Sequence, residues 1–396
     1  MLKCTNSNNL VLLRVLFFNF VMMKRLSVVF TVLVGIVTSI VFMSNKTIDD
    51  LRVLYSKPIS QWPKPTIDEG VKWEEFKALP KIDTNSLKRM QRPVVKLGKT
   101  LFFDPILSSS NQISCSSCHN PQTSWGDHLT VPIGHDHTEG TRNTISLLNV
   151  YARKQLFWDG RARTLEEQAL FPIEAHHEMN MELTKLIPKL KAIPGYRKMF
   201  KEAFGDEDFS MPEVMKALAE FQRTLQSRRS RFDEFLDGKH TAMTDKEIQG
   251  MHLFRTKARC MNCHNGEFLT DDDFHNIGLT YYKRKYQDLG LYDITKNPED
   301  VGKFRTPSLR DVMNTGPWMH NGLFDNIIGV INMYNSGMVM NNPKTPEQLA
   351  DAMHPKTDVL LKPLELTREE IQAIAAFLEA TTATKYRMPR PESLPR

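Results

Sequence analysis

The chain has 396 residues, which is enough for two domains that each bury a hydrophobic core. Hydrophobic residues make up 41% of the chain and charged residues 25%, a composition that excludes an intrinsically disordered protein. The formal net charge is +6, but residues 1–45 hold four cations and no acidic residue. The remaining charge of +2 excludes the strongly basic surface of a nucleic-acid-binding protein.

The first element is an uncharged apolar run of 18 residues at positions 26–43, directly after Lys24 and Arg25. This length lies at the short end of the transmembrane range and beyond the core of a typical signal peptide. Cations before such a run keep that end in the cytoplasm, so we expect the rest of the chain in the periplasm. No small-residue cleavage site follows, so residues 1–45 are predicted to be an uncleaved membrane anchor, with a cleaved signal peptide as the alternative.

The residues on either side of this run have no clear structural pattern. Translation from Met22 or Met23 would remove residues 1–21 and with them Cys4, to which we assign no role. Residues 46–89 are rich in proline and charge, and are predicted to be a linker or N-terminal extension ahead of the folded domains.

The pattern C-x-x-C-H occurs twice, as CSSCH at 115–119 and as CMNCH at 260–264. It is typical of c-type heme attachment, in which two thiols form thioethers to the porphyrin and the histidine binds iron from one face. A four-cysteine zinc site would need its cysteine pairs about 15–20 residues apart, and a thioredoxin-like pair would need a strand–helix–strand unit. Neither condition is met, so we predict two covalent c-type hemes, attached through Cys115, Cys118 and His119 and through Cys260, Cys263 and His264.

Related segments precede the two motifs. LGKTLFFD at 97–104 and QGMHLF at 249–254 share the pattern G-x-x-L-F. A small residue in a helix lets a second helix cross closely, so Gly98 and Gly250 are predicted to lie at two equivalent helix crossings.

Helix signals dominate the rest of the chain. Three capping boxes mark helix starts, at SMPE (210–213), TDKE (244–247) and TREE (367–370). Strand-like alternation is sparse, so the predicted fold is mainly α, with two cytochrome c-like heme domains in tandem. The predicted boundaries are 90–236 for the first domain, 240–385 for the second and 386–396 for a loose tail.

Other segments occur in a specific order: LFFDPILSSSNQISCSSCH, GHDHTEGTRN, FWDGRA, FRTPSLRDV and GPWMHNG. Together they resemble the bacterial diheme cytochrome c peroxidases and their MauG-type relatives, which oxidise residues of a partner protein. The resemblance covers about residues 95–385. It implies that the first heme, with His119 as proximal ligand, reacts with peroxide, and that the second, with His264 as proximal ligand, relays electrons.

The resemblance also implies catalytic residues. Glu178, with Gln168 and Pro172 at the family's spacing, corresponds to the carboxylate that takes a proton from bound peroxide and returns it to the departing oxygen. The alternative is an ordinary loop glutamate in contact with solvent. Trp158 in FWDGRA corresponds to a tryptophan between the two hemes that relays an electron, and the alternative is a core residue.

Two further residues correspond to sixth ligands of the hemes. His135, in a glycine-flanked loop, corresponds to a removable ligand of the first heme, which MauG-type proteins lack. Tyr334 lies fourteen residues after the histidine of MHNG, where the peroxidases usually have methionine and MauG-type proteins have tyrosine. A shift in register would bring Met333 or Met338 to the iron instead.

The resemblance finally implies a calcium site between the domains, formed by Asn143, Thr315 and Pro317 through one side-chain and two backbone oxygens. Our favoured hypothesis is a periplasmic peroxidase, tethered by residues 26–43, that reduces hydrogen peroxide to water with electrons from a small cytochrome c or cupredoxin. The alternatives are a MauG-like enzyme that oxidises a partner's side chains and a non-catalytic diheme electron carrier, against which Glu178 argues. A homodimer is compatible with the sequence, and no nucleic-acid partner is expected.

Overall fold

A computed structural model describes residues 50–383 and 388–396, and the chain divides into two compact units, Met1–Pro58 and Ile59–Arg396. In the first unit the described residues contain a short helix at positions 50–55. The predicted anchor at 26–43 lies outside the described residues. Within the described ranges, no helix is long and apolar enough to cross a membrane.

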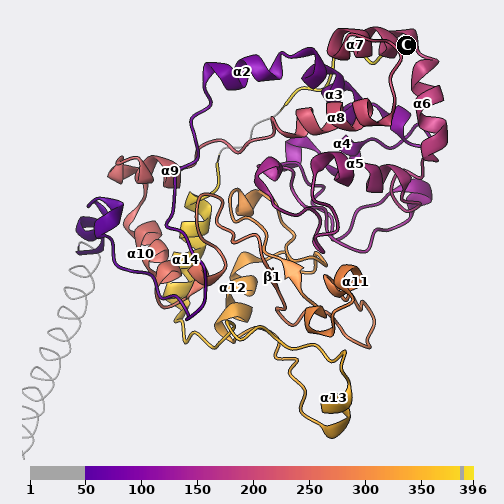
Figure 1. Cartoon of the computed structure of the whole chain (residues 1–396). Coiled ribbons are helices and arrows are strands. Elements are labelled where there is room, and N and C mark those ends of the chain that lie inside the picture. The colour runs from indigo at the N-terminus through magenta and orange to yellow at the C-terminus, as the bar shows by residue number, and fades with distance from the viewer. Residues whose placement is uncertain (1–49, 384–387) are drawn as a thin grey trace, which may run out of the picture. The chain divides into compact units, whose positions relative to one another are not determined.

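The second unit is mainly helical, which confirms the mainly α part of the predicted fold (Figure 1). Its first half contains α2 (Thr84–Met90), α3 (Pro93–Phe103), α4 (Cys115–Cys118), α5 (Leu165–Glu174), α6 (Leu183–Lys191), α7 (Pro194–Phe204), α8 (Met211–Gln222) and α9 (Arg231–Leu236). Its second half contains α10 (Asp245–Arg255), α11 (Tyr292–Thr295), α12 (Ile327–Asn335), α13 (Pro346–Ala350) and α14 (Arg368–Ala380). The two-residue strands β1 (Phe274–His275) and β2 (Phe304–Arg305) pair antiparallel, with Phe274 opposite Arg305.

The helix starts follow the predicted capping boxes. Ser210, Thr244 and Thr367 are the N-caps of α8, α10 and α14, and each forms a reciprocal capping box with the glutamate three residues on. The predicted starts are therefore confirmed, because a capping box satisfies backbone amides that the first helical turn leaves without partners.

Two close helix crossings organise the core of this unit. A Cβ atom on Gly98 of α3 would lie 1.8 Å from the carbonyl oxygen of Ala217 in α8. A Cβ atom on Gly250 of α10 would lie 1.9 Å from the carbonyl oxygen of Ala373 in α14. The two glycines therefore permit equivalent backbone contacts, as the shared G-x-x-L-F pattern predicts.

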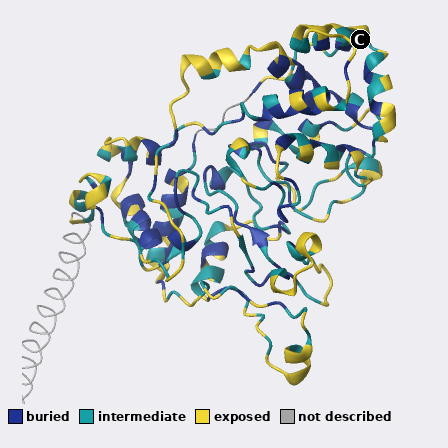
Figure 2. Cartoon of the chain, viewed as in Figure 1, coloured by how far each residue is buried: buried dark blue, intermediate teal, exposed yellow. Residues whose placement is uncertain are grey.

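Part of the predicted extension is packed into the second unit. Residues 62–79, which we call the strap, bury Trp62, Phe76 and Leu79 to 7%, 1% and 3% exposure. The Phe76 ring packs edge-on against Phe232, with the ring centroids 5.2 Å apart. The strap is therefore part of the folded core rather than a linker, and Figure 2 shows the buried core that it joins.

The tail at 388–396, part of the segment predicted to be loose, contacts the folded unit at two points. Met388 is 7% exposed and joins the core formed around α3, α7 and α8. The backbone amide of Gly195 donates to the carbonyl of Arg396 at 3.4 Å. The prolines of the tail predict an irregular segment, but the Met388 side chain is buried in the core and anchors the start of the tail.

Candidate active site and heme attachment segments

The first attachment segment begins with α4, whose four residues are the CSSC of the motif. Ser114 and Ser117 form a capping box that fixes the start of this helix. Both motif cysteines are half-buried. The Nδ1 atom of His119 lies 3.0 Å from the carbonyl oxygen of Trp125. Because a carbonyl only accepts, Nδ1 carries the hydrogen and Nε2 is left to bind a metal.

The second attachment segment contains the 3₁₀ turn η7 (Cys260–Asn262) and repeats this arrangement. The Nδ1 atom of His264 lies 3.0 Å from the carbonyl oxygen of Leu269, so its Nε2 is also left for a metal. A cavity of about 270 Å³ opens beside it, and its wall includes both motif cysteines, His264 and many apolar side chains. Two thiols, an oriented histidine and an apolar cavity fit a covalently bound heme.

The strap holds this second segment from behind. The backbone amides of Asp68 and Glu74 donate to the side-chain oxygens of Asn262 and Asn265 at 2.8 and 3.1 Å. Asn262 is one of the two variable residues within the motif, and Asn265 follows its histidine. Both asparagines are 4% exposed, so these bonds fix the backbone of the attachment segment.

A charged cluster beside Cys263 has no counterpart in the sequence predictions. His275 contacts Asp358 through Nδ1 at 2.6 Å and Asp271 through Nε2 at 3.0 Å, and its Nε2 lies 3.6 Å from the Cys263 sulfur. Burial opposes a charge on His275, but the two carboxylates outweigh it and raise the pKa of the imidazole to about 12. The i, i+4 spacing of Asp271 and His275 is a weak sequence signal for contact between these two residues. Asp358 is distant in sequence, so no local pattern indicates that it joins them.

Tyr334 lies at the end of α12 and lines the same cavity as His264. Of the three candidate sixth ligands, all within the described part of the chain, Tyr334 alone is in the cavity wall, and Met333 and Met338 are not. Burial raises the pKa of the Tyr334 phenol, and nearby Cys263 adds to this shift.

Trp158 is held between segments of the first and second halves of the unit. Its indole nitrogen donates to the carbonyl oxygen of Asn143 at 2.9 Å, and its own carbonyl accepts from the Arg305 amide at 2.9 Å. Its ring lies edge-on to the His320 ring, which stacks on Phe304 with centroids 3.5 Å apart. Trp158 is 8% exposed and lines the second cavity. The indole therefore has a single fixed orientation.

Glu178 and His135 are joined through the backbone. The His135 amide, in the turn η4 (His135–His137), donates to the Glu178 carbonyl oxygen at 2.9 Å. Gly134 permits this approach, because a Cβ atom there would lie 2.1 Å from the His177 carbonyl oxygen. The Nδ1 atom of His135 is buried and has no hydrogen-bond partner among the described residues.

The Glu178 side chain is half-buried, with 34% of its surface exposed. Burial raises the pKa of its carboxyl, while His177 and Arg161 act in the opposite direction. The Glu178 loop is tied to the chain just before the first motif, because the Met179 carbonyl accepts from the Ser109 amide at 3.1 Å.

The other predicted residues of this group lie on α5. Pro172 lies inside the helix, and its carbonyl accepts from the Met179 amide at 3.1 Å, which ties the helix to the Glu178 loop. Gln168 lies one turn earlier on the same helix and is half-buried.

Asn143, Thr315 and Pro317 all line the wall of the second cavity. The side-chain amide of Asn143 donates to the Leu129 carbonyl at 2.9 Å, so its side-chain oxygen is the atom left for a cation. The three predicted calcium ligands thus come from segments far apart in sequence and line one cavity.

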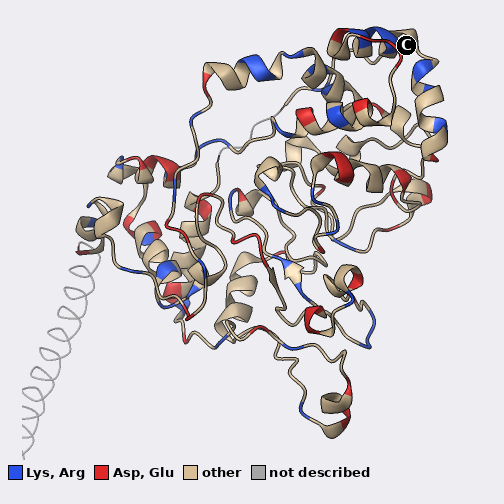
Figure 3. Ribbon diagram, viewed as in Figure 1, with Lys and Arg blue, Asp and Glu red and all other residues tan. Residues whose placement is uncertain are grey.

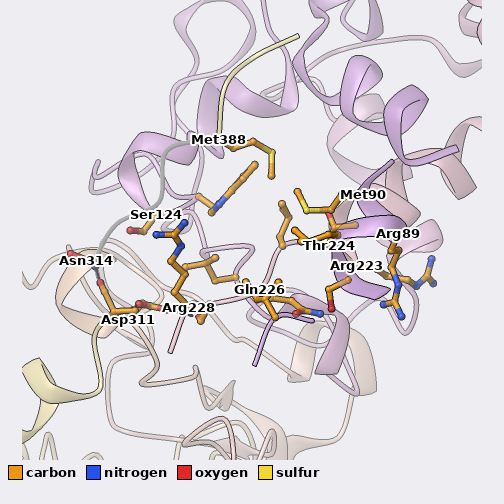
Figure 4. A pocket seen from close by; sticks show the side chains of 18 residues that line it. Arg89, Met90, Ser124, Arg223, Thr224, Gln226, Arg228, Asp311, Asn314 and Met388 are labelled. Carbon is orange, nitrogen blue, oxygen red and sulfur yellow. Dashed lines mark hydrogen bonds between the residues drawn. The ribbon is translucent and has the colours of Figure 1, made fainter. Parts of the chain in front are cut away.

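A separate pocket of about 170 Å³ lies behind the first attachment segment (Figure 4). Its wall includes Trp125, the hydrogen-bond partner of His119, and Asp311, which accepts from the Ser227 hydroxyl. Figure 4 shows Arg228 and Met388 beside it. None of the predicted site residues lines this pocket.

The helical fold and the two attachment segments define a protein that carries two covalent c-type hemes. A family model described as "Di-haem cytochrome c peroxidase" matches residues 92–241. The MauG methylamine utilization protein of Methylophilus methylotrophus is 42% identical over 246 residues, which are 61% of this chain and 71% of that protein. The cytochrome-c peroxidase IdrP1 of Pseudomonas sp. (strain SCT) is 35% identical over 320 residues, 74% of this chain and 81% of that protein.

Among solved structures, a MauG-like protein associated with microbial copper homeostasis is similar at a TM-score of 0.65 and 29% identity, over 81% of this chain and 93% of that one. The chain therefore belongs to the diheme cytochrome c peroxidase family, which includes MauG. Membership makes it a peroxidase-type oxidoreductase with two c-type hemes.

Proposed function

We propose that this protein reduces hydrogen peroxide to water in the periplasm, with electrons from a small cytochrome c or cupredoxin. The observation that carries the proposal is the position of Glu178. A half-buried carboxyl with a raised pKa, close to the first attachment segment, suits proton exchange with a bound peroxide. The relatives named cytochrome-c peroxidase support the same reaction.

When bound, the two hemes supply the iron for peroxide reduction and the storage of an electron. The Glu178 carboxylate accepts a proton from one peroxide oxygen and returns it to the oxygen that departs as water. Two electrons and two protons in total convert one hydrogen peroxide into two waters. Trp158, fixed by Asn143 and Arg305, provides an aromatic path for the electrons.

His119 and His264 would hold the irons through Nε2. We propose His135 as the displaceable ligand on the peroxide side, because its buried Nδ1 has no hydrogen-bond partner within the described residues. Tyr334 is the proposed sixth ligand of the second heme, a role supported by its position in the cavity wall. Gln168 and Pro172 would orient the Glu178 loop.

The remaining proposals concern the assembly of the protein. Oxygen atoms of Asn143, Thr315 and Pro317 would hold one calcium ion. Three features of the assembly stay predictions: two heme domains at 90–236 and 240–385, a tether to the inner membrane through the N-terminal segment, and a homodimer.

Steady-state turnover with hydrogen peroxide and a reduced small cytochrome tests the proposed reaction. We expect many turnovers per molecule, and a loss of about 100-fold in kcat for Glu178→Ala with both heme spectra nearly unchanged. Normal turnover of this variant would refute the role of Glu178.

A MauG-like oxidation of a partner protein is the second candidate, favoured by Tyr334 in the second cavity and by the MauG relatives. It predicts slow turnover with reduced cytochrome and a long-lived state oxidised by two electrons after peroxide is added. Stopped-flow spectroscopy of the protein mixed with peroxide distinguishes this candidate from the peroxidase.

A further inference from the structure

The segment YYKRKYQ at 281–287 forms an exposed loop, which we call the basic–tyrosine loop. It contains three tyrosines, three cations and no acidic residue. Tyr286 is 62% exposed, the Lys283 side chain is 69% exposed, and Arg284 and Lys285 are also exposed. Figure 3 shows the run of Lys and Arg on the loop beside α11.

Hydrogen bonds close the loop at its base. At its base the Asp288 amide donates to the Thr280 carbonyl at 2.9 Å, and within it the Arg284 amide donates to the Tyr281 carbonyl at 2.9 Å. Asp288 is itself fixed by a two-pronged bond from Arg142, at 2.7 and 2.8 Å. Such an ordered loop loses little conformational freedom when a partner binds.

The side chains of the loop are ordered against one another. The guanidinium of Arg284 lies 5.1 Å from the Tyr281 ring centre, and the ammonium of Lys285 lies 4.9 Å from that of Tyr286. Tyr281 and Tyr286 meet edge-on at 6.3 Å. These contacts place the exposed ring of Tyr286 and the exposed cations of Arg284 and Lys285 beside the half-buried ring of Tyr281.

The backbone is unfavourable for these residue types. Tyr281, Lys283 and Tyr286 have positive φ angles of 49°, 55° and 70°, a region in which glycine is far better tolerated. Positive φ angles also occur at buried residues of this chain such as Trp125 and Leu269, so the exposed cations and aromatic rings distinguish the loop, rather than its backbone.

Two of the three cations carry uncompensated charge. Lys283 is paired with Asp351 at 2.7 Å. Within the described residues, no carboxylate pairs with Arg284 or Lys285. The loop therefore presents a local positive charge that attracts an acidic surface.

The loop begins and ends near the second cavity. Before the loop, Ile277 lines that cavity. After the loop, the Leu291 amide donates to the carbonyl oxygen of Lys303, and the neighbouring Phe304 lines the same cavity. A protein seated on the loop would therefore lie on the side of the second attachment segment. That is the side at which electrons would enter in the proposed function.

We propose that the basic–tyrosine loop is the docking site for an acidic face of the electron-donor protein, an inference that rests on the proposed function. Tyrosine and arginine dominate binding energy at protein interfaces, and both project from this loop. A membrane surface is the less favoured partner, because sequence segments that bind anionic lipid usually cluster about 4–8 cations. The loop has only three.

The test compares two variants with the same change in charge. Arg284→Glu combined with Lys285→Glu reverses the free charge of the loop. Lys198→Glu combined with Lys201→Glu, on α7, is the control, because both lysines are exposed and lie on the first half of the unit. The probes are an acidic and a basic reduced c-type cytochrome, a small uncharged reductant and phosphatidylglycerol vesicles.

We expect the loop variant to raise KM for the acidic cytochrome about tenfold or more at low salt, with kcat and the rate with the small reductant unchanged. High salt should remove this difference, and the control variant should keep KM within about twofold. Equal KM values in the two variants would overturn the proposal. So would a loop variant that loses only its binding to vesicles, since the loop would then bind lipid.

The docking proposal and the proposed function can fail separately. If the unmodified protein does not reduce peroxide even with the small reductant, the proposed function fails. Calorimetric titration of the oxidised acidic cytochrome into both variants still decides the docking site, because binding needs no turnover. Binding that is weakened only in the loop variant supports the proposal, and equal binding in both variants refutes it.

Discussion

Glu178 is a single residue whose environment predicts a pH dependence. Burial raises the pKa of its carboxyl above the ordinary value of 4.5, and the ionised form is the one that accepts a proton from peroxide. The rate should therefore fall as the pH drops through the raised pKa and the carboxylate is protonated. We expect the acidic limb of kcat/KM for peroxide above pH 4.5, and Glu178→Gln should lack this limb.

The matched control is Glu182→Gln, four residues away. Glu182 is exposed, and bonding to Lys185 lowers the pKa of its carboxyl, so its loss should leave the acidic limb in place. An unchanged limb in Glu178→Gln would assign the titration to another group.

Tyr334 offers a second prediction at this scale. A phenolate ligand favours Fe(III), whereas a thioether favours Fe(II), so Tyr334→Met should raise the midpoint potential of one heme on the order of 100 mV. Spectroelectrochemical titration measures both potentials, and low-temperature EPR reports the ligands of both irons. Tyr196→Phe is the control, because this buried tyrosine bonds to Asp104 in the first half of the unit.

Unchanged spectra in Tyr334→Met would show that tyrosine is not the ligand. A sulfur-to-iron charge-transfer band in the unmodified protein would point instead to Met333 or Met338. Either result would also weaken the MauG-like candidate, which depends on tyrosine at this position.

The residues of the site differ in how well the sequence predicts them. The attachment cysteines and histidines lie within five consecutive letters, so their positions follow from the pattern alone. The cluster of Asp271, His275 and Asp358 depends on a contact between residues 83 positions apart, which no local pattern records. The proposed calcium ligands are similar, because backbone oxygens leave no trace in the side-chain sequence.

At the scale of helices, the two glycine crossings make a prediction about stability. Gly98→Ala or Gly250→Ala would place a methyl group within 2 Å of a backbone carbonyl oxygen on the crossing helix, so the helices must separate. We expect each substitution to lower the free energy of unfolding by about 3 kcal/mol, measured by urea denaturation of the holoprotein.

Gly329→Ala in α12 is the matched control. The nearest atom to its Cβ would be 3.8 Å away, so the substitution should be neutral or stabilise by about 0.5–1 kcal/mol. A small effect at Gly98 or Gly250 would mean that the helices do not cross as closely as described.

The helices that could be predicted are those with local signals. Capping boxes identify the starts of α8, α10 and α14 because each signal lies within four residues. The strands β1 and β2 have only two residues each, too short for a period-2 pattern to appear. The turn η7 at the second motif likewise has no helical period.

At the scale of the whole second unit, the strap was the main feature that local patterns did not predict. Its prolines and charges resemble a linker, yet its backbone bonds to Asn262 and Asn265, 194 and 191 positions away. Burial of a polar segment depends on such distant partners. The strap therefore supports the second attachment segment, although the sequence alone suggests only a connection to it.

The strap also contains the partner of a buried charge. Arg255 at the end of α10 is fully buried, and its guanidinium bonds to both oxygens of Glu75 and to the Pro63 carbonyl at 2.9 Å. Its cation also lies 5.3 Å from the Trp62 ring centre. Removing the carboxylate leaves a buried cation without its counter-charge, so Glu75→Gln should lower the free energy of unfolding by about 3 kcal/mol.

Glu74→Gln is the neighbouring control, because the Glu74 side chain is 65% exposed and pairs with the exposed Lys77. Exposed pairs contribute little, so this variant should change the free energy of unfolding by less than about 1 kcal/mol. Urea denaturation of both holoproteins, followed by circular dichroism, measures the difference. Equal losses of unfolding free energy in the two variants would mean that the Arg255 charge is compensated without Glu75. The strap would then hold the second attachment segment through its bonds to the asparagines and its aromatic packing alone.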